Sequence, residues 1–289
     1  MFSAVPCRDG ICKVPRRNGE EEYDIQYRIF RPMNLSSQQA APIVVLHGGP
    51  SVPSDYLEPL VDVIPYRSVI FYDQLGCGRS DEPDDSDLYS IDFAVNDLEI
   101  LLSTLNVRRF HLYGQSFGGI LAFEFLKKLA SEESENDVKC LSVVLSSSPT
   151  NVKQVEDEAN RLVTELMETI EDKSDIQEAF RKVHQCRTSV MPEPLQKAYA
   201  SAGNTFRGTS AISDYIANSP KPEAKRMPSA MVMRGEHDFV TEICLKDWKN
   251  LFNHKFVRMK VLENCSHHGL LENANDYGSI VDSFLAEYD

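Results

Sequence analysis

Short apolar runs alternate with helical patterns along most of the chain. Each run is rich in β-branched residues and is followed by turn formers, which is typical of a buried strand. The runs are IVVLHG (43–48), SVIFYD (68–73), RFHLYG (109–114), LSVVLS (141–146), AMVMRG (230–235) and VRMKVL (257–262). They show no polar alternation, as expected for strands covered by helices on both faces of a parallel sheet. The pattern therefore predicts an α/β fold with an open, mostly parallel, doubly wound sheet.

The segments between these runs have helical spacing. Ser90 precedes apolar residues that recur every three or four positions up to Leu105, so it is a favourable helix cap. The C-terminal segment repeats this spacing from Ile280 to Leu285. The N-terminal stretch to about residue 31 is expected to add an antiparallel hairpin at one edge of the sheet.

Residues 150–226 interrupt the alternation, because this region contains no convincing strand. Its apolar positions between 152 and 170 step by three and four, a second helical stretch covers roughly 175–187, and a third lies near 194–202. We therefore predict a helical cap inserted between sheet strands, with core segments 1–149 and 227–289 on either side. A lid over an active site and an insert that simply packs on the sheet are both compatible with this pattern.

Composition places the chain among ordinary globular proteins. Of its 289 residues, 42% are apolar and 26% are charged. The net charge of −14 argues against a nucleic-acid partner, because phosphate binding requires clustered Lys and Arg. No apolar run reaches the roughly 20 residues that cross a bilayer, and the N-terminus lacks the apolar core of a secretory signal. We expect a cytoplasmic protein without a membrane partner; its oligomeric state stays open.

The seven cysteines are scattered and no pair has Cys-x-x-Cys spacing. An odd count without such pairs indicates neither a disulfide framework nor a zinc site. We predict free thiols, with a Cys7–Cys12 disulfide as the alternative, and no metal or other cofactor.

The segment GQSFGG (114–119) follows the apolar run FHLY and precedes the helical pattern ILAFEFLKKLA. A Gly-x-Ser-x-Gly sequence between a strand and a helix is typical of a nucleophile elbow, in which a strained turn exposes the serine. The flanking glycines allow strand and helix to approach closely. Ser116 is therefore the candidate nucleophile, and the Phe117 amide at the helix N-terminus is a candidate oxyanion donor.

A serine nucleophile requires a base and an orienting acid, here expected in the chain order Ser, Asp, His. Asp238 follows the strand AMVM, and His267 follows the strand VRMKVL. Both lie where the carboxyl ends of parallel strands collect functional groups. His267 is expected to take the Ser116 proton while Asp238 fixes its tautomer. The adjacent His268 remains an alternative base, and Asp238 has the alternative of a loop acid paired with a neighbour.

The loop after the first apolar run reads HGGPS (47–51). Its glycines keep backbone amides accessible, so Gly49 is the candidate for the second oxyanion donor.

These segments, together with FYDQLGCGRSDEP (71–83), GEHD and CSH, resemble the proline iminopeptidase family of α/β hydrolases, which includes the tricorn-interacting aminopeptidase. The resemblance covers most of the chain and is strongest over residues 43–125. It implies an α/β-hydrolase fold with a helical cap, the triad Ser116, Asp238 and His267, and release of an N-terminal residue, often proline, from short peptides or amides. No cofactor is implied.

The resemblance also identifies substrate-binding candidates. Glu193 matches a cap glutamate that holds the free amine of the substrate; a carboxylate there would pair with an ammonium group. The alternative is a helix-start acid favoured by the helix dipole. Phe239 stands where peptidase members often carry a second amine-binding glutamate, and Ser51 replaces the last glycine of HGGPG. The segment between Asn204 and Ser213 lacks the family's usual cap motifs.

The sequence thus predicts a serine hydrolase that forms an acyl-enzyme and releases an N-terminal residue from a small-molecule or short-peptide substrate. The alternative is a hydrolase of a small ester, lactone or amide without a free amine, which Phe239 and the reduced cap favour. A catalytically silent binding protein of the same fold is a third hypothesis.

Overall fold

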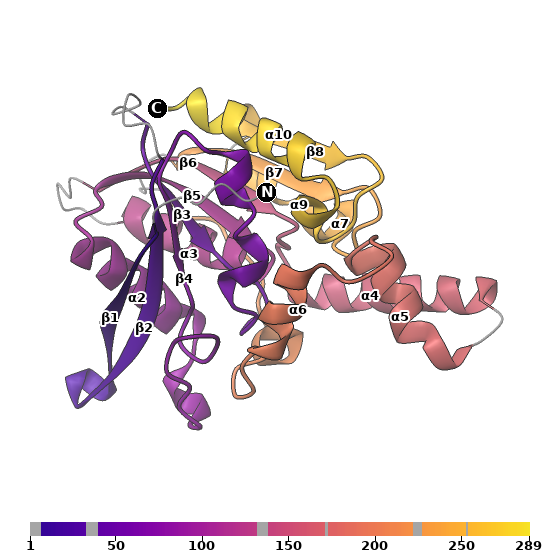
Figure 1. The fold of residues 1–289 in the computed structure, drawn as a ribbon, viewed down its shortest axis with the longest axis horizontal. Coiled ribbons are helices and arrows are strands. Elements are labelled where there is room, and N and C mark those ends of the chain that lie inside the picture. The colour runs from indigo at the N-terminus through magenta and orange to yellow at the C-terminus, as the bar shows by residue number, and fades with distance from the viewer. Residues whose placement is uncertain (1–6, 33–39, 132–137, 171–172, 222–226, 253) are drawn as a thin grey trace.

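The computed structural model describes residues 7–32, 40–131, 138–170, 173–221, 227–252 and 254–289. Its central sheet has eight strands in the order β1-β2-β4-β3-β5-β6-β7-β8 (Figure 1). The strands are β1 (Cys7–Arg16), β2 (Glu21–Phe30), β3 (Ile43–Leu46), β4 (Val69–Tyr72), β5 (Arg109–Gln115), β6 (Lys139–Ser146), β7 (Ser229–Gly235) and β8 (Val257–Leu262). Strands β3 to β8 pair in parallel, and β1 and β2 form the antiparallel hairpin at one edge. The predicted parallel sheet and edge hairpin are confirmed.

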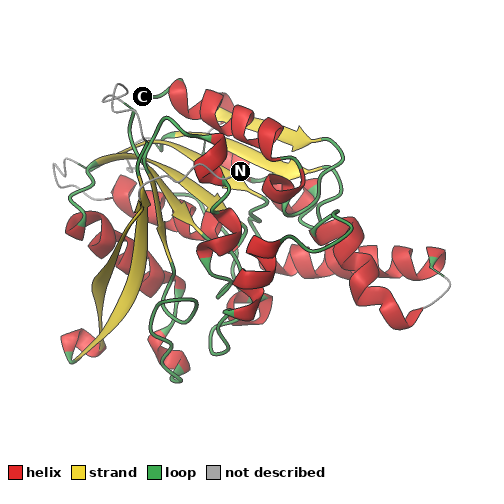
Figure 2. Ribbon diagram, in the orientation of Figure 1, coloured by secondary structure: helices red, strands yellow, loops and turns green. Residues whose placement is uncertain are grey.

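Helices cover both faces of this sheet (Figure 2). The helices are α1 (Leu60–Val63), α2 (Ile91–Thr104), α3 (Phe117–Ser131), α4 (Val152–Thr169), α5 (Ile176–Phe180), α6 (Glu193–Ala200), α7 (Glu242–Leu245), α8 (Trp248–Leu251), α9 (Gly269–Glu272) and α10 (Ala274–Ala286). Ser90 caps α2 as predicted, because its side chain accepts a hydrogen bond from the Phe93 amide at 3.0 Å.

Strand β3 shows why the central strands are apolar without alternation. Val44 and Leu46 pack into the core beneath α2 and α3, whereas Ile43 and Val45 pack into the core beneath α1 and α10. All four side chains are fully buried. Because the faces alternate along a strand, a sheet covered on both sides needs apolar residues at every position.

A buried ion pair fixes the edge hairpin to the body. The Arg16 guanidinium donates to both carboxylate oxygens of Asp97 on α2, at 2.8 and 2.7 Å, and its Nε donates to the Leu88 carbonyl at 2.8 Å. Both side chains are almost completely buried. This bidentate geometry provides hydrogen-bond partners for a charge pair that is buried away from water.

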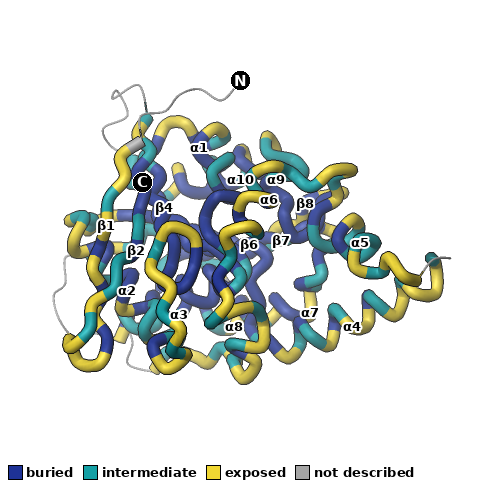
Figure 3. The backbone as a smooth tube through the Cα atoms, turned by 60° about the horizontal axis from the view of Figure 1, so that its bottom comes forward, coloured by how far each residue is buried: buried dark blue, intermediate teal, exposed yellow. Residues whose placement is uncertain are grey.

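Helices α4, α5 and α6 lie in the insertion between β6 and β7. In the described part of this insertion, strand-like pairing is limited to an isolated bridge between Asn151 and Ile216. Helices α4 and α5 extend away from the sheet (Figure 1), and much of their length is exposed (Figure 3). The predicted boundaries at 150 and 226, and the movement of this insertion as a lid, stay predictions; residues 222–226 lie outside the described residues.

Two expectations concern the chain as a whole. None of the helices in the described ranges is long and apolar enough to cross a membrane. The six cysteines with described side chains, from Cys12 to Cys265, are free thiols. The side chain of Cys7, and with it the alternative Cys7–Cys12 disulfide, lies outside the described residues.

Candidate active site

Ser116 lies in a tight turn between β5 and α3. Its φ of +53° is in the left-handed region, which is uncommon for non-glycine residues and strains the backbone. A Cβ on Gly114 would lie 2.4 Å from the Gly118 carbonyl oxygen, and a Cβ on Gly118 would lie 2.1 Å from the Leu46 carbonyl oxygen. Both flanking positions therefore require glycine. The turn leaves Ser116 half-buried and facing a pocket.

The two candidate oxyanion donors border the same pocket. Phe117 is the first residue of α3, and Gly49 lies in the loop after β3 with a φ of +115°. In the hydrogen bonding of the described residues, neither of these two amides donates to another protein group. A free amide at a helix N-terminus is suited to a developing negative charge.

Asp238 and His267 are brought together at the carboxyl ends of β7 and β8. His267 Nδ1 donates to Asp238 Oδ1 at 2.9 Å, and the same oxygen accepts from the Val240 amide at 2.9 Å. The two loops approach closely because position 235 is glycine: a Cβ there would lie 2.4 Å from the carbonyl oxygens of Cys265 and Ser266. His267 lines the pocket together with Ser116.

The adjacent His268 has a different environment. It packs edge-on against the Tyr56 ring, with ring centroids 5.3 Å apart, and its Nε2 lies 3.4 Å from the Tyr199 hydroxyl. Burial lowers the pKa of His268 well below its usual value, so its imidazole is neutral. The Asp238 contact therefore distinguishes His267 from His268 as the candidate base.

Tyr56 and Gln115, to which the sequence analysis assigns no role, connect the loop of residues 47–51 to the candidate base. We call residues 47–51 the oxyanion loop. The Tyr56 hydroxyl accepts from the Gly48 amide at 2.7 Å and donates to Gln115 Oε1 at 2.7 Å. Gln115 Nε2 in turn donates to the His267 carbonyl at 3.4 Å. Gln115 is part of the quoted GQSFGG segment, whereas nothing near Tyr56 in the sequence signals its contact. This chain of hydrogen bonds links the oxyanion loop, the turn that carries Ser116 and the loop that carries His267.

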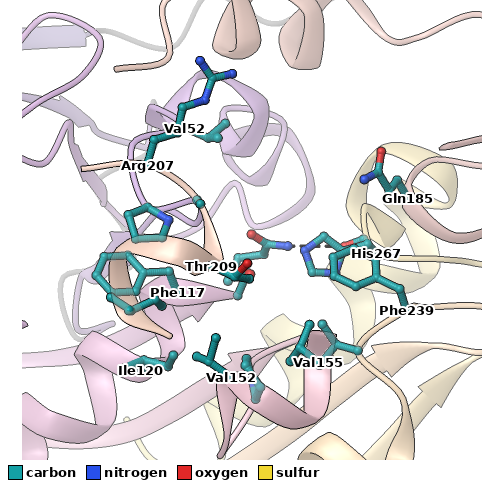
Figure 4. Close-up of a pocket in the computed structure, with 18 of the residues that line it drawn as sticks. Val52, Phe117, Ile120, Val152, Val155, Gln185, Arg207, Thr209, Phe239 and His267 are labelled. Carbon is teal, nitrogen blue, oxygen red and sulfur yellow. Dashed lines mark hydrogen bonds between the residues drawn. The ribbon is translucent and has the colours of Figure 1, made fainter. Parts of the chain in front are cut away.

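The pocket has a volume of about 190 Å³ and mainly apolar walls. Figure 4 shows Ile120, Val152 and Val155 along one side and Phe239 beside His267. The Phe239 and His267 rings are tilted by 33° with centroids 4.3 Å apart. Phe239 thus lines the pocket, and its role in substrate binding stays a prediction.

The charges at the pocket differ from the expectation. Glu193 is the first residue of α6; it is exposed and does not line the pocket. The helix-start alternative fits this location, and the amine-binding role of Glu193 stays a prediction. Among the described residues that line the pocket, none is Asp or Glu. Arg207 is at the rim, and Figure 4 shows its guanidinium directed away from His267.

The loop around the site is held by buried polar contacts. Asp73 accepts from the Arg79 amide and guanidinium at 3.1 and 3.0 Å, as expected for residues that fix a turn. His47 Nδ1 donates to the Gly48 carbonyl at 3.0 Å, and its Nε2 accepts from the Gln74 amide at 2.9 Å. Burial lowers the pKa of His47, which agrees with a neutral, structural imidazole. In the described chain, no cluster of three or more His, Cys, Asp or Glu side chains is placed to hold a metal.

Comparison with known proteins identifies the family of this fold. The α/β-hydrolase fold family matches residues 41–274. The chain belongs to this family. This α/β hydrolase is also similar to curated proline iminopeptidases, so the resemblance found in its motifs is confirmed.

The relatives match nearly the whole α/β hydrolase. The proline iminopeptidase of Saccharolobus solfataricus is 28% identical over 303 residues, covering 93% of each chain. That of Lactobacillus helveticus is 28% identical over 297 residues, covering 92% of this chain and 96% of the relative. The crystal structure of the proline iminopeptidase of Mycobacterium smegmatis has a TM-score of 0.79 at 22% identity, covering 96% of this chain and 98% of the other. This last likeness concerns the fold.

Proposed function

We propose that this α/β hydrolase is a serine hydrolase that cleaves an acyl bond of a small substrate through an acyl-enzyme on Ser116. The observation that supports this most strongly is the Asp238–His267 hydrogen bond at a pocket shared with Ser116. The left-handed backbone of Ser116 adds to it, because such strain is retained where the turn serves a function.

The geometry supports a definite sequence of steps. Because Nδ1 of His267 is bonded to Asp238, its Nε2 is the nitrogen that accepts the Ser116 proton as Oγ attacks the acyl carbon. The amides of Gly49 and Phe117 stabilise the negative charge on the acyl oxygen. Collapse of this intermediate breaks the bond to the leaving group, which takes the proton from His267. Water, deprotonated by the same imidazole, then releases the acid and restores Ser116.

The first candidate substrate is the N-terminal residue of a short peptide or amino-acid amide, proline among them. The support is the similarity to curated proline iminopeptidases over more than nine-tenths of the chain. A cleaved amide would place its acyl carbon at Ser116 and its N-terminal side chain against the apolar wall of Ile120, Val152 and Val155.

A second candidate is an ester, lactone or amide without a free amine. The specific observation in its favour is that the described residues lining the pocket provide no carboxylate for an ammonium group. Glu193 is exposed at the start of α6, and Phe239 presents a ring where an acid would be needed. Burial of an unpaired ammonium is unfavourable, so this pocket suits a neutral acyl group better.

The test compares prolyl- and alanyl-β-naphthylamide with their N-acetylated forms and with p-nitrophenyl acetate, using wild type and Ser116→Ala. Ser116-dependent cleavage of the free-amine amides alone would establish an aminopeptidase. Equal or faster cleavage of the acetylated amides, or cleavage of the ester without cleavage of the free-amine amides, would establish the second candidate. The absence of any Ser116-dependent cleavage, together with no labelling of Ser116 by a fluorophosphonate, would contradict both and favour a silent binding protein.

The Glu193→Gln variant tests whether Glu193 binds the free amine of the substrate. The exposed location predicts kcat/KM within about twofold of wild type for every substrate, because a surface substitution away from the pocket changes little. A selective loss of kcat/KM for free-amine substrates would show that Glu193 reaches the substrate after all.

A further inference from the structure

Ser51, in the loop that contains Gly49, occupies a position suited to glycine. Its φ is +67°, in the left-handed region, and the residue is 3% exposed. A side chain at such a φ strains the backbone, whereas glycine adopts this conformation freely. A buried hydroxyl also needs a hydrogen-bond partner. The contacts of Ser51 are therefore informative about why a serine is present.

Ser51 makes two hydrogen bonds to the helical insertion, more than 150 residues further along the chain. Its carbonyl accepts from the Gly203 amide at 3.0 Å, and its hydroxyl donates to the Phe206 carbonyl. The preceding Pro50 carbonyl accepts from the Gly208 amide at 3.4 Å. We call residues 203–208 the docking segment. The docking segment is thus attached to the loop that carries the Gly49 amide.

The docking segment also contacts the side chain of Phe117, whose amide is the other candidate oxyanion donor. The Phe206 ring packs edge-on against the Phe117 ring, with centroids 6.1 Å apart, and it stacks on Tyr89 with centroids 5.7 Å apart. Gly203 sits so close to the neighbouring loop that a Cβ on it would lie 1.6 Å from the Gly76 carbonyl oxygen. The docking segment is therefore tightly packed between the loop that contains Ser51 and the loop that contains Gly76.

One short segment of the insertion consequently touches both sides of the candidate oxyanion hole. We propose that Ser51 is a positioning residue, whose hydroxyl joins the docking segment to the oxyanion loop and so holds the Gly49 and Phe117 amides in register. This inference rests on the proposed function. It assigns a role to the serine in HGGPS and couples the insertion to the chemical step.

The test uses two substitutions that remove the same hydroxyl. Ser51→Ala keeps the Cβ and the strained backbone, whereas Ser51→Gly relieves the strain. Both are expected to lower kcat about tenfold with KM within twofold, less than the 10²–10³-fold loss on removing one oxyanion donor outright. Both should slow fluorophosphonate labelling of Ser116 by a similar factor, because the phosphoryl oxygen occupies the oxyanion position. The melting temperature of each variant checks that the loss is not unfolding.

Ser201→Ala is the matched control. Its hydroxyl donates to the Lys197 carbonyl one turn earlier at 3.0 Å and is exposed, just outside the docking segment. Kinetics and labelling of Ser201→Ala should equal those of wild type. A loss in Ser51→Gly without one in Ser51→Ala would indicate backbone flexibility as the cause and would overturn the role of the hydroxyl. Wild-type rates in both Ser51 variants would overturn it as well.

Failure of the proposed function is distinguishable from failure of this inference. Wild-type protein that is not labelled at Ser116 would contradict the serine hydrolase assignment. In that case amide hydrogen exchange decides the inference: Ser51→Ala should accelerate exchange at Gly203 and Gly208 relative to wild type and to Ser201→Ala. Unchanged exchange at these two amides would show that the Ser51 hydroxyl does not hold the docking segment, and would overturn the inference.

Discussion

The Tyr56 hydroxyl is a single group on which two parts of the site depend, so Tyr56→Phe is an informative perturbation. The residue is 2% exposed, and its oxygen bonds to both the Gly48 amide and Gln115 Oε1 at 2.7 Å. Phenylalanine keeps the ring and its packing but leaves these two groups without a partner. Each unsatisfied buried polar group costs about 1–3 kcal/mol, so for two groups we expect the free energy of unfolding to fall by about 2–6 kcal/mol.

Urea denaturation of wild type and Tyr56→Phe measures this difference. The control is Tyr72→Phe, which removes the same atom from an equally buried ring whose hydroxyl has no hydrogen-bond partner among the described residues, and which should change stability by less than about 1 kcal/mol. In the folded fraction, kcat should also fall, because Gln115 positions the His267 carbonyl and Gly48 precedes an oxyanion donor. A Tyr56→Phe protein as stable and as active as wild type would refute the network as we describe it.

Three further predictions follow from other contacts. Asp238→Asn should keep the fold but lower kcat by about 10⁴, because the imidazole loses its correct tautomer; a loss below tenfold in steady-state kinetics would exclude Asp238 as the orienting acid. Asp97→Ala should lower the free energy of unfolding by about 3–5 kcal/mol in urea, because it leaves the Arg16 charge buried without its partner. Burial lowers the pKa of His111 from 6.5 to about 4, so the unfolded chain binds a proton there that the folded chain does not. Stability should therefore fall as pH decreases from 6.5 to 4, and His111→Asn should flatten this fall; an unchanged slope would contradict the assignment.

The parts of the fold that the sequence predicts are those encoded locally. The run IVVL is apolar at every position because both faces of β3 are covered, and Ser90 caps α2 through a residue three positions away. The glycines of GQSFGG are recognisable because their requirement is steric and local. The positions of Ser116, Asp238 and His267 are recognisable because each follows a parallel strand, and the carboxyl ends of parallel strands meet at one edge of the sheet.

The parts that the sequence does not predict depend on contacts between distant segments. The choice between His267 and His268 is made by the direction in which one loop presents each ring, and this depends on Asp238 29 residues away. The local sequence around Glu193 is the same whether its side chain faces the pocket or solvent. Only the placement of α6 therefore distinguishes an amine-binding carboxylate from a helix-start acid. The Ser51–Phe206 contact joins residues 155 positions apart, and no local pattern indicates it.

The most direct test of the central claim is labelling of the folded protein with a fluorophosphonate, followed by mass spectrometry of the intact chain and its peptides. The account predicts addition of one probe per chain at Ser116, no addition in Ser116→Ala, and much slower addition in Asp238→Asn. Labelling that is absent, or that persists in Ser116→Ala, would contradict the assignment of Ser116 as an activated nucleophile.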